Sequence, residues 1–357
     1  MSLPEPVEIY EPGMCFRAEI REQPEALRRL LTHNAEFARV ADAMRERGPL
    51  VRIVGHGSSD NAATYGVYAF GVLAGRTALR DSIALTVYFD AAFDLTGSTV
   101  LGLSQSGQTP DVVEYLRRAR RRGAFTVAVT NDPASELAQV AEAVLPLAAG
   151  PELAVAATKT YLNQLAALAL LAAHVGENGK RVADGVKSVS EQLEQALPTL
   201  EAQAQALALP FAYVGRMFVI GRGPEFATAR ETALKLLETC RLAASPLTAT
   251  DLVHGPVAVL DPLFPVWTIA SRDQTLSAVQ EASQRVREFG STIVACGNAA
   301  DTIEGADYRL PVPAPDVPLL SPLLSVVPGQ LFAAALARGK GFDPDRPRGL
   351  SKVTLAQ

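Results

Sequence analysis

The chain has 357 residues, of which 48% are hydrophobic and 20% are charged. This composition excludes an intrinsically disordered protein, and the length suits one large domain or two ordinary ones. Lysine and arginine number 33 against 38 acidic residues, so the formal net charge is −5. An acidic chain lacks the basic face of a sequence-independent nucleic-acid binder, although a local pocket can still hold a small anion.

Signals for export, disulfides and membrane insertion are weak. The N-terminus has no basic stretch followed by an apolar core, so we expect no export. The apolar run at 165–175 is too short to cross a membrane and contains His174. Three distant cysteines without CxxC spacing predict neither a disulfide framework nor a zinc site: Cys15, Cys240 and Cys296. A cytoplasmic protein without membrane contact is expected.

The pattern along the chain divides it into four regions. Residues 1–48 form an expected N-terminal helical segment, with a helical pattern over 24–47. A first domain follows at 49–200 and a second at 201–340. Residues 341–357 are rich in proline and glycine, which predicts an extended tail over the surface.

An internal duplication relates the two expected domains. VRIVGHGSS at 51–59 matches MFVIGRGPE at 217–225. The matched positions pair Gly55 with Gly221, Gly57 with Gly223, Ser104 with Ser271, Gly123 with Gly290 and Asn131 with Asn298. The spacing drifts by a single residue, so we infer two copies of one supersecondary plan.

Each copy alternates short apolar runs with helical segments. In the first copy three runs have the length and β-branched content of strands: 51–54, 100–103 and 126–129. Residues 110–122 have apolar positions at helical spacing, and Gly123 can close that helix. In the second copy a helix is expected at 276–289 and a strand at 292–295. We therefore predict an α/β protein with two tandem, doubly wound parallel sheets.

The polar loop Ser104-Gln-Ser-Gly-Gln-Thr109 joins a predicted strand to a predicted helix. Thr109 is a favoured N-cap residue and Pro110 suits the first helical turn, so the helix N-terminus faces this loop. Amides, hydroxyls and a permissive glycine at a helix N-terminus suit a phosphate dianion. The alternative is an ordinary polar loop that caps its own helix.

The turn Gly55-His-Gly-Ser-Ser-Asp60 has part of a dinucleotide fingerprint, but Asp60 replaces the third glycine of GxGxxG. NAD binding is therefore disfavoured. Ser58 and Ser59 follow a strand and open a helix, and ligands of open α/β sheets bind beside the carboxyl ends of neighbouring strands. We expect these serines to face the same crevice as the 104–109 loop.

Glu231, Lys235 and Glu238 are spaced along one helical face. On an exposed helix they would form a solvated row of ion pairs. The residues between them are apolar, which favours a largely buried helix on which a carboxylate can act as a base. His254 and Lys352 have plainer interpretations, a structural histidine and a solvated tail lysine.

Together these segments resemble the sugar isomerase (SIS) family, and within it the isomerase half of glutamine:fructose-6-phosphate amidotransferase, the glucosamine-6-phosphate synthase. SQSGQT is similar to the family's SQSGET, and GPELAVAATK at 150–159 to its GPEIGVASTK. Further matches are ALKLLE at 233–238, HGP at 254–256 and DPDRPRGLSKVT at 343–354. The resemblance covers nearly the whole chain and implies two SIS domains.

The resemblance also implies a role for each matching residue. Glu238 takes the place of the base that moves a proton between C1 and C2, with Lys235 and Glu231 as its charged neighbours. His254 would assist ring opening from the other subunit of a homodimer, and Lys352 would form an imine with the keto sugar. The sugar phosphate would be held by Ser59, Ser104, Gln105, Ser106, Thr109, Val155 and Ala157. This chemistry requires neither a metal nor a cofactor.

Departures from the synthase pattern shape the expected function. No glutaminase domain precedes residue 19, so glutamine-dependent synthesis by this chain alone is not expected. Ala157 and Gln108 replace a serine and a glutamate of the family motifs, which leaves the sugar open. We expect a phosphosugar isomerase and deaminase that converts glucosamine 6-phosphate, or a similar amino-sugar phosphate, to fructose 6-phosphate and ammonia. The alternatives are a deglycase or isomerase of another amino-sugar or fructosamine phosphate, and a non-catalytic sugar-phosphate sensor.

Overall fold

The computed structural model describes residues 10–352, which contain two five-stranded parallel sheets. The first has the order β2-β1-β3-β4-β5 and the second the order β7-β6-β8-β9-β10, so the two sheets share one topology. The first sheet consists of β1 (Leu50–Val54), β2 (Thr77–Arg80), β3 (Thr99–Leu103), β4 (Phe125–Thr130) and β5 (Ala143–Pro146). The second consists of β6 (Arg216–Gly221), β7 (Ala243–Thr248), β8 (Val266–Ile269), β9 (Ile293–Gly297) and β10 (Tyr308–Pro311). The predicted fold class and the duplication are confirmed.

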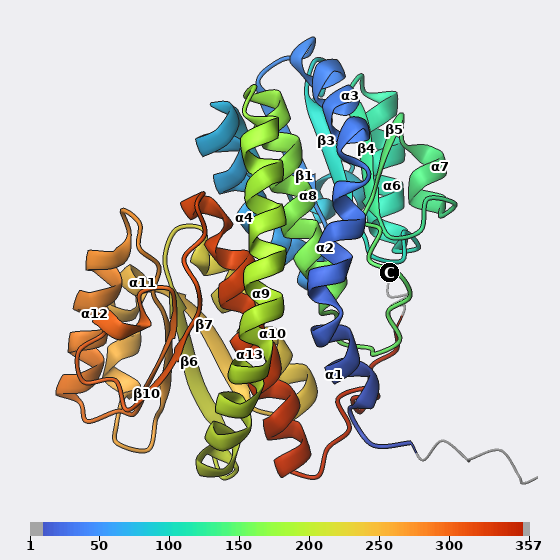
Figure 1. The fold of residues 1–357 in the computed structure, drawn as a ribbon. Coiled ribbons are helices and arrows are strands. Elements are labelled where there is room, and N and C mark those ends of the chain that lie inside the picture. Colours follow the sequence, from blue (N-terminus) through green and yellow to red (C-terminus); the bar gives the residue numbers. More distant parts are fainter. Residues whose placement is uncertain (1–9, 353–357) are drawn as a thin grey trace, which may run out of the picture.

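Helices cover both faces of the first sheet (Figure 1). Side chains of successive strand residues point to opposite faces, and on β3 Leu101 packs into one core cluster while Val100 packs into another. The helices of this repeat are α4 (Ser58–Ala74), α5 (Ile83–Val87), α6 (Pro110–Arg121), α7 (Glu136–Val140) and α8 (Lys159–Val175). Residues 110–121 are helical as predicted, and Gly123 follows in a left-handed conformation with φ 82°.

The N-terminal segment forms three helices, α1 (Met14–Arg21), α2 (Gln23–Leu31) and α3 (Asn34–Arg45). The prediction of continuous helix over 24–47 is therefore wrong at Thr32 and His33. The Thr32 hydroxyl donates to the Arg29 carbonyl at 2.7 Å, and the amides of Thr32 and His33 bond three residues back. A threonine that bonds its own preceding turn in this way competes with the regular helical ladder.

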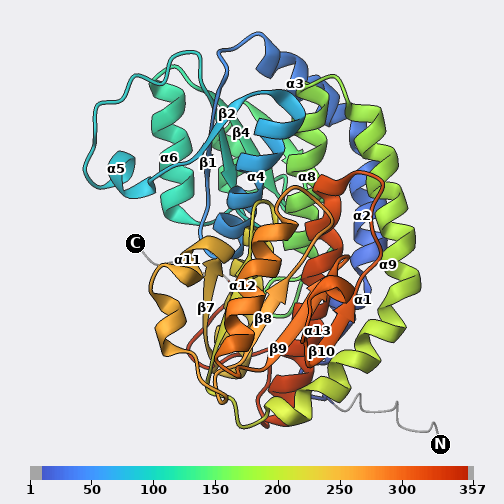
Figure 2. The same ribbon diagram turned by 90° about the vertical axis from the view of Figure 1, so that its left-hand side faces the viewer.

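The long helix α9 (Gly179–Ala208) connects the two repeats and runs beside both of them (Figures 1 and 2). It packs against α2 and α8 near the first sheet and against α13 (Ser321–Gly339) near the second. Among the residues described, 318–339 is the single helical stretch apolar and long enough to cross a membrane, and 94% of its most apolar window is buried inside the protein.

The second repeat places α10 (Glu225–Cys240) against both α13 and α4. Gly329 of α13 makes the approach of α10 feasible, since a Cβ there would lie 2.6 Å from the Thr232 hydroxyl. The other helices are α11 (Ala249–Val253) and α12 (Leu276–Glu288). This packing brings α10, a helix of the second repeat, into contact with α4 of the first repeat.

The tail after α13 is extended, as predicted, but it is anchored rather than loosely laid over the surface. The Asp345 carboxylate is buried and accepts the amides of Phe16 at 2.7 Å and Cys15 at 3.1 Å. Its backbone carbonyl accepts the amide of Val155 at 3.1 Å. Contacts with α1 and with the first repeat therefore fix the path of the tail as far as Lys352.

Candidate active site

A cavity of about 660 Å³ lies where the two repeats meet. This volume lies in the range of small-molecule sites. The order of the first sheet reverses between β1 and β3, and the loops after these two strands form one wall, at the position where open α/β sheets bind ligands. The other walls come from 155–157, from α10 and from the tail. The lining residues are His56, Gly57, Ser58, Ser59, Tyr88, Leu103, Ser104, Gln105, Ser106, Thr109, Asp111, Val155, Ala157, Lys235, Glu238, Leu350, Ser351 and Lys352.

The 104–109 loop turns its hydroxyls toward one another and toward the cavity. The Oγ atoms of Ser104 and Thr109 lie 3.0 Å apart, and Ser104 Oγ accepts the amide of Gly107 at 3.1 Å. Gly107 has φ 63°, and a Cβ there would lie 2.0 Å from Ser135 Oγ, so the loop requires glycine at this position. Thr109 occupies the N-cap position of α6, but its side chain makes no capping bond. A loop that caps its own helix through Thr109 is therefore not what the structure contains.

The first turn of α4 forms the neighbouring part of the wall. Ser59 accepts a hydrogen bond from the Gln164 side chain of α8 at 2.9 Å. Ser58 donates to Glu231 Oε1 at 2.9 Å, which links α4 to α10 of the second repeat. The serines after β1 and the loop after β3 thus share the cavity, as the sequence predicted.

Glu231, Lys235 and Glu238 form a buried ionic cluster on α10. Lys235 Nζ lies 2.7 Å from Glu238 Oε2, 3.3 Å from Glu231 Oε1 and 3.3 Å from Ser58 Oγ. The side chains of Glu231 and Lys235 are fully buried, while that of Glu238 is 22% exposed. The interpretation as a solvated row of ion pairs is therefore excluded. Only Lys235 and Glu238 reach the cavity wall; Glu231 stands behind them and accepts Asn61 Nδ2 at 2.9 Å.

Burial and charge act in opposite directions within this cluster. Burial raises the pKa of Glu231, and the nearby Lys235 ammonium and the Asn61 amide only partly offset it. Burial alone would lower the pKa of Lys235, but the two adjacent carboxylates outweigh burial and raise that pKa. Lys235 is therefore a permanent cation next to Glu238, where it can stabilise negative charge on a bound ligand.

Lys352 brings a second amine to the cavity. Its Nζ lies 2.9 Å from Glu152 Oε2 and 2.7 Å from the Ala154 carbonyl oxygen, and its side chain is 26% exposed. Burial tends to raise the pKa of Glu152, but Lys352 and the bonds from Thr158 and Thr160 prevail and hold that pKa below its usual value. The tail lysine is thus a paired residue of the cavity wall, which excludes the plain solvated lysine.

His254, unlike Glu231 behind the cavity wall, lies away from the predicted site residues of its own chain. It caps the C-terminus of α11, is exposed to solvent and is absent from the cavity lining. Sequence reasoning in turn missed His56, Tyr88 and Asp111, which do line the cavity. Of these, His56 could have been predicted from the sequence, since it lies inside the glycine turn after the first strand.

The two departures from the family motifs differ in position. Ala157 lines the cavity beside Val155, so the site lacks the hydroxyl that the serine of the family motif would supply there. Gln108 is exposed and does not belong to the lining. Only the change at 157 can act directly on a ligand.

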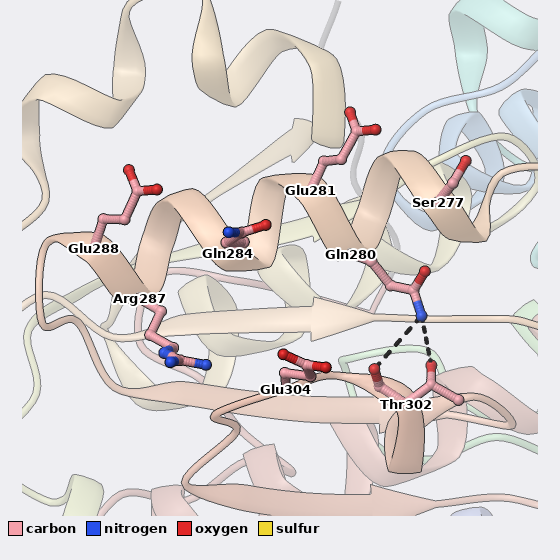
Figure 3. A pocket seen from close by; sticks show the side chains of 8 residues that line it. All are labelled: Ser277, Gln280, Glu281, Gln284, Arg287, Glu288, Thr302 and Glu304. Atoms are coloured by element: carbon pink, nitrogen blue, oxygen red, sulfur yellow. Dashed lines mark hydrogen bonds between the residues drawn. The ribbon is translucent and has the colours of Figure 1, made fainter.

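A separate hollow of about 500 Å³ lies on the outer side of the second repeat, between α12 and residues 302–304 (Figure 3). It shares no residue with the first cavity, and Gln280 bonds Thr302 across it. Three carboxylates and one arginine line it: Glu281, Glu288, Glu304 and Arg287. An acidic lining disfavours a phosphate, so this hollow is not an alternative site for a sugar phosphate.

Comparison with known proteins agrees with this architecture. The family model described as "SIS domain" matches twice, at residues 50–174 and 211–337. A glutamine–fructose-6-phosphate aminotransferase (isomerizing) from Methanothermobacter thermautotrophicus is 36% identical over 349 residues, covering 95% of this chain and 57% of the relative. This chain therefore spans a little over half the length of that relative.

Two solved structures resemble the whole chain. A protein from Silicibacter pomeroyi, described as a candidate phosphosugar isomerase, has a TM-score of 0.80 at 34% identity and covers 92% of this chain and 99% of its own. The C-terminal domain of glucosamine-fructose-6-phosphate aminotransferase from Francisella tularensis has a TM-score of 0.86 at 24% identity. It covers 97% of this chain and 100% of that domain, a likeness that shows the shared fold.

Proposed function

This chain belongs to the SIS domain family, and on that premise we propose that it is a phosphosugar isomerase that acts on an amino-sugar phosphate. The favoured reaction converts glucosamine 6-phosphate and water to fructose 6-phosphate and ammonia. One observation carries the proposal: Glu238, Lys235 and Lys352 line the same cavity as the hydroxyl-rich loop at 104–109. Glu238 and Lys352 are far apart in the chain, so their convergence is a property of the fold.

The first repeat would hold the phosphate. Ser59, Ser106 and Thr109 offer hydroxyls beside the N-terminus of α6, where amides and the helix dipole favour an anion. A firm grip on this remote group would fix the position of C1 and C2 deeper in the cavity. Val155 and Ala157 would pack against the sugar.

The second repeat would supply the proton transfer. After ring opening, Glu238 removes the proton from C2, and the electrons move toward the C1 carbonyl oxygen to give an enolate-like intermediate. Lys235 stabilises the negative charge, and Glu238 returns the proton to C1 while the C2 amine loses a proton and the C1 oxygen gains one. The product is an open-chain ketose imine at C2.

Lys352 would complete the release of ammonia. Its ammonium passes a proton to the imine nitrogen, the amine so freed adds to C2, and ammonia leaves, so that Lys352 becomes the imine nitrogen. Water then hydrolyses this bond, which frees fructose 6-phosphate and restores the amine. The ion pair with Glu152 holds Lys352 at the cavity wall before the sugar binds.

The position of His254 supports a homodimer. This histidine is exposed and lies outside the cavity of its own chain, so it could assist ring opening only in a neighbouring copy. Mixing a Glu238→Gln chain with a His254→Asn chain tests the arrangement. If the two residues serve one site across an interface, mixed dimers regain up to half of the wild-type sites; strictly monomeric protein would contradict the proposal.

The location proposed for the reaction is the cytoplasm. Cys15, Cys240 and Cys296 are all unpaired, and the last two are buried. Unpaired thiols are typical of a reducing compartment.

The decisive experiment measures products. The purified chain is incubated with glucosamine 6-phosphate while ammonia and fructose 6-phosphate are followed, and the two should appear in equal amounts. Other amino-sugar and fructosamine phosphates form the second arm, because Ala157 changes the cavity where the family has a serine. Tight binding without turnover of any of them would contradict the enzyme and support a sugar-phosphate sensor.

A further inference from the structure

His56 lines the cavity from within the glycine turn that follows β1. Its side chain is 54% exposed, so the ring is not part of the core. Its Nε2 atom lies 3.5 Å from Oδ2 of Asp111, in the first turn of α6. The Tyr88 hydroxyl donates to Oδ1 of the same carboxylate at 2.8 Å. His56, Asp111 and Tyr88 therefore form one linked group at the phosphate end of the cavity.

Lys235 lies near one part of the hydroxyl-rich wall, with its Nζ 3.3 Å from Ser58 Oγ. Ser58, Ser59 and the 104–109 loop offer hydroxyl, amide and backbone groups only. The two lysines of the lining are engaged elsewhere, Lys235 with Glu231 and Glu238, and Lys352 with Glu152. Apart from these two lysines, which are paired with carboxylates, His56 is the one side chain among the described lining residues that can carry positive charge.

Asp111 places a carboxylate beside the proposed phosphate position. A carboxylate in the first turn of α6 lies next to the helix N-terminus that would face the phosphate. The negative charges of the carboxylate and the phosphate would repel each other. A protonated imidazole beside Asp111 offsets that repulsion and keeps a second N–H for the ligand. The titratable groups around His56 are Asp111 and Tyr88, with Lys235, Glu238 and Lys352 elsewhere in the lining.

We propose that His56 is a phosphate-binding residue of this site, which faces the sugar phosphate as a cation while Asp111 and Tyr88 position its ring. The inference rests on the proposed function and deepens it. Hydroxyls and amides alone bind sugar hydroxyls as readily as phosphate, whereas a cation favours the dianion. His56 would therefore make the site selective for phosphorylated sugars.

The test measures binding and turnover separately. Calorimetric titration with glucosamine 6-phosphate, inorganic phosphate and unphosphorylated glucosamine gives the Kd values. His56→Gln should weaken binding of the two phosphate ligands about tenfold, as expected for loss of one charged hydrogen bond, and leave kcat within about threefold. His56→Lys should restore most of the affinity, and His33→Gln, at a half-buried histidine of the N-terminal segment outside the cavity lining, should leave phosphate binding unchanged.

The outcomes separate this inference from the function on which it rests. Unchanged phosphate binding in His56→Gln overturns the inference, and so does a large fall in kcat at unchanged affinity, which would make His56 an acid–base group. In both cases a wild-type protein that turns over its substrate keeps the proposed function. A wild-type chain that binds no sugar phosphate removes both. Tyr88→Phe provides a second variant, with a loss of about two- to threefold in affinity expected when Asp111 loses one of its partners.

Discussion

The two repeats share one strand order but use the crevice at the reversal of that order in different ways. In the first repeat Ser59 and Ser104 border the cavity. In the second, the matched positions are Glu225 and Ser271, and Ser271 donates to Glu225 at 2.5 Å. Glu225 also accepts the hydroxyls of Ser325 at 3.0 Å and Thr228 at 2.6 Å, and it is fully buried. The second repeat thus holds its own carboxylate where the first presents hydroxyls to a ligand.

This difference indicates a division of work. Glu225 places a carboxyl group at the position that matches Ser59 of the first crevice, and the same contacts tie the start of α10 to α13 and to Ser271, which follows β8. The far end of α10 is then free to present Lys235 and Glu238 to the cavity of the first repeat. If this is correct, changes in the first repeat should act mainly on affinity, and changes on α10 mainly on the rate of the chemical step.

The largest effect is expected for Glu238→Gln. The amide keeps the shape of the side chain but cannot accept the proton from C2, so kcat should fall by about 10³-fold or more. The Kd of glucosamine 6-phosphate should stay within about threefold, as judged by calorimetry. Turnover close to that of the wild type would break the assignment of the base and the division between the repeats.

Glu225→Ser gives the second repeat the residue that the first repeat has at the matched position. Three buried hydroxyls lose their acceptor and a cavity appears, so the free energy of unfolding should fall by about 2–3 kcal/mol in denaturant titrations. Inorganic phosphate should restore part of this loss, because an external anion can occupy the vacated place. Glu225→Gln, which keeps an acceptor oxygen, is the control with a smaller loss.

If phosphate did not stabilise Glu225→Ser, the two crevices would share their backbone but not the ability to bind an anion.

Burial raises the pKa of Glu225, and the three hydroxyls only partly oppose it. The side chain of Glu225→Gln is neutral at every pH, whereas the wild type loses stability when Glu225 ionises. The stability of the variant relative to the wild type should therefore be greater at high pH than at low pH.

Thr109→Val should have a medium effect confined to affinity. The substitution keeps the shape but removes a hydroxyl that lines the cavity and contacts Ser104. One lost hydrogen bond to a phosphate corresponds to an increase of about tenfold in KM, with kcat nearly unchanged. Steady-state kinetics decide the point, and an equal fall in kcat would contradict the assignment of this loop to binding.

The smallest effect is expected at Glu19, which holds the loop of the first repeat next to Lys352. Its carboxylate accepts the amides of Leu153 and Ala154. Burial, reinforced by the nearby Glu152, raises the pKa of Glu19 to about 7 against the opposing effect of the Leu153 amide. The folded protein therefore binds this proton more tightly than the unfolded chain does, and stability is lost as pH rises from the ordinary glutamate range through about 7.

Glu19→Gln should remove this part of the pH dependence. Relative to the wild type, the Tm of the variant should rise by about 1–2 °C between acidic and mildly alkaline pH, the shift that ~1 kcal/mol causes in a protein of this size. Differential scanning calorimetry at several pH values measures it. Parallel Tm profiles for the two proteins would show that Glu19 does not titrate in this window.

Local patterns in the sequence predicted the elements well. The strands at 51–54, 100–103 and 126–129 and the helix at 110–122 agree with the structure within two residues at each end. The break at Thr32 escaped prediction, because a side-chain bond to the preceding turn leaves the apolar periodicity of 24–47 unchanged. The duplication was visible because each copy needs glycines and apolar strands at similar spacing.

Partners across the chain could not be predicted in the same way. Lys352 and Glu152 are 200 residues apart, and nothing in either segment alone identifies the other. The pairing arises because Asp343 and Asp345 bind the tail to the first residues of the N-terminal segment, which themselves hold residues 153–154 through Glu19. The group of His56, Asp111 and Tyr88 likewise joins the turn after β1, the first turn of α6 and the C-terminus of α5.

The sequence by itself determined the two parallel sheets, their duplication and the polar loop at the end of β3, since apolar period, strand length and turn residues act over a few neighbouring positions. Only the tertiary structure decided which polar groups face a ligand. Ser59 and Glu225 stand at matched positions, yet one borders an open cavity and the other is enclosed by hydroxyls of α10, α13 and the loop after β8. That outcome depends on how distant helices pack against each sheet, because burial and long-range contacts set the environment of a side chain.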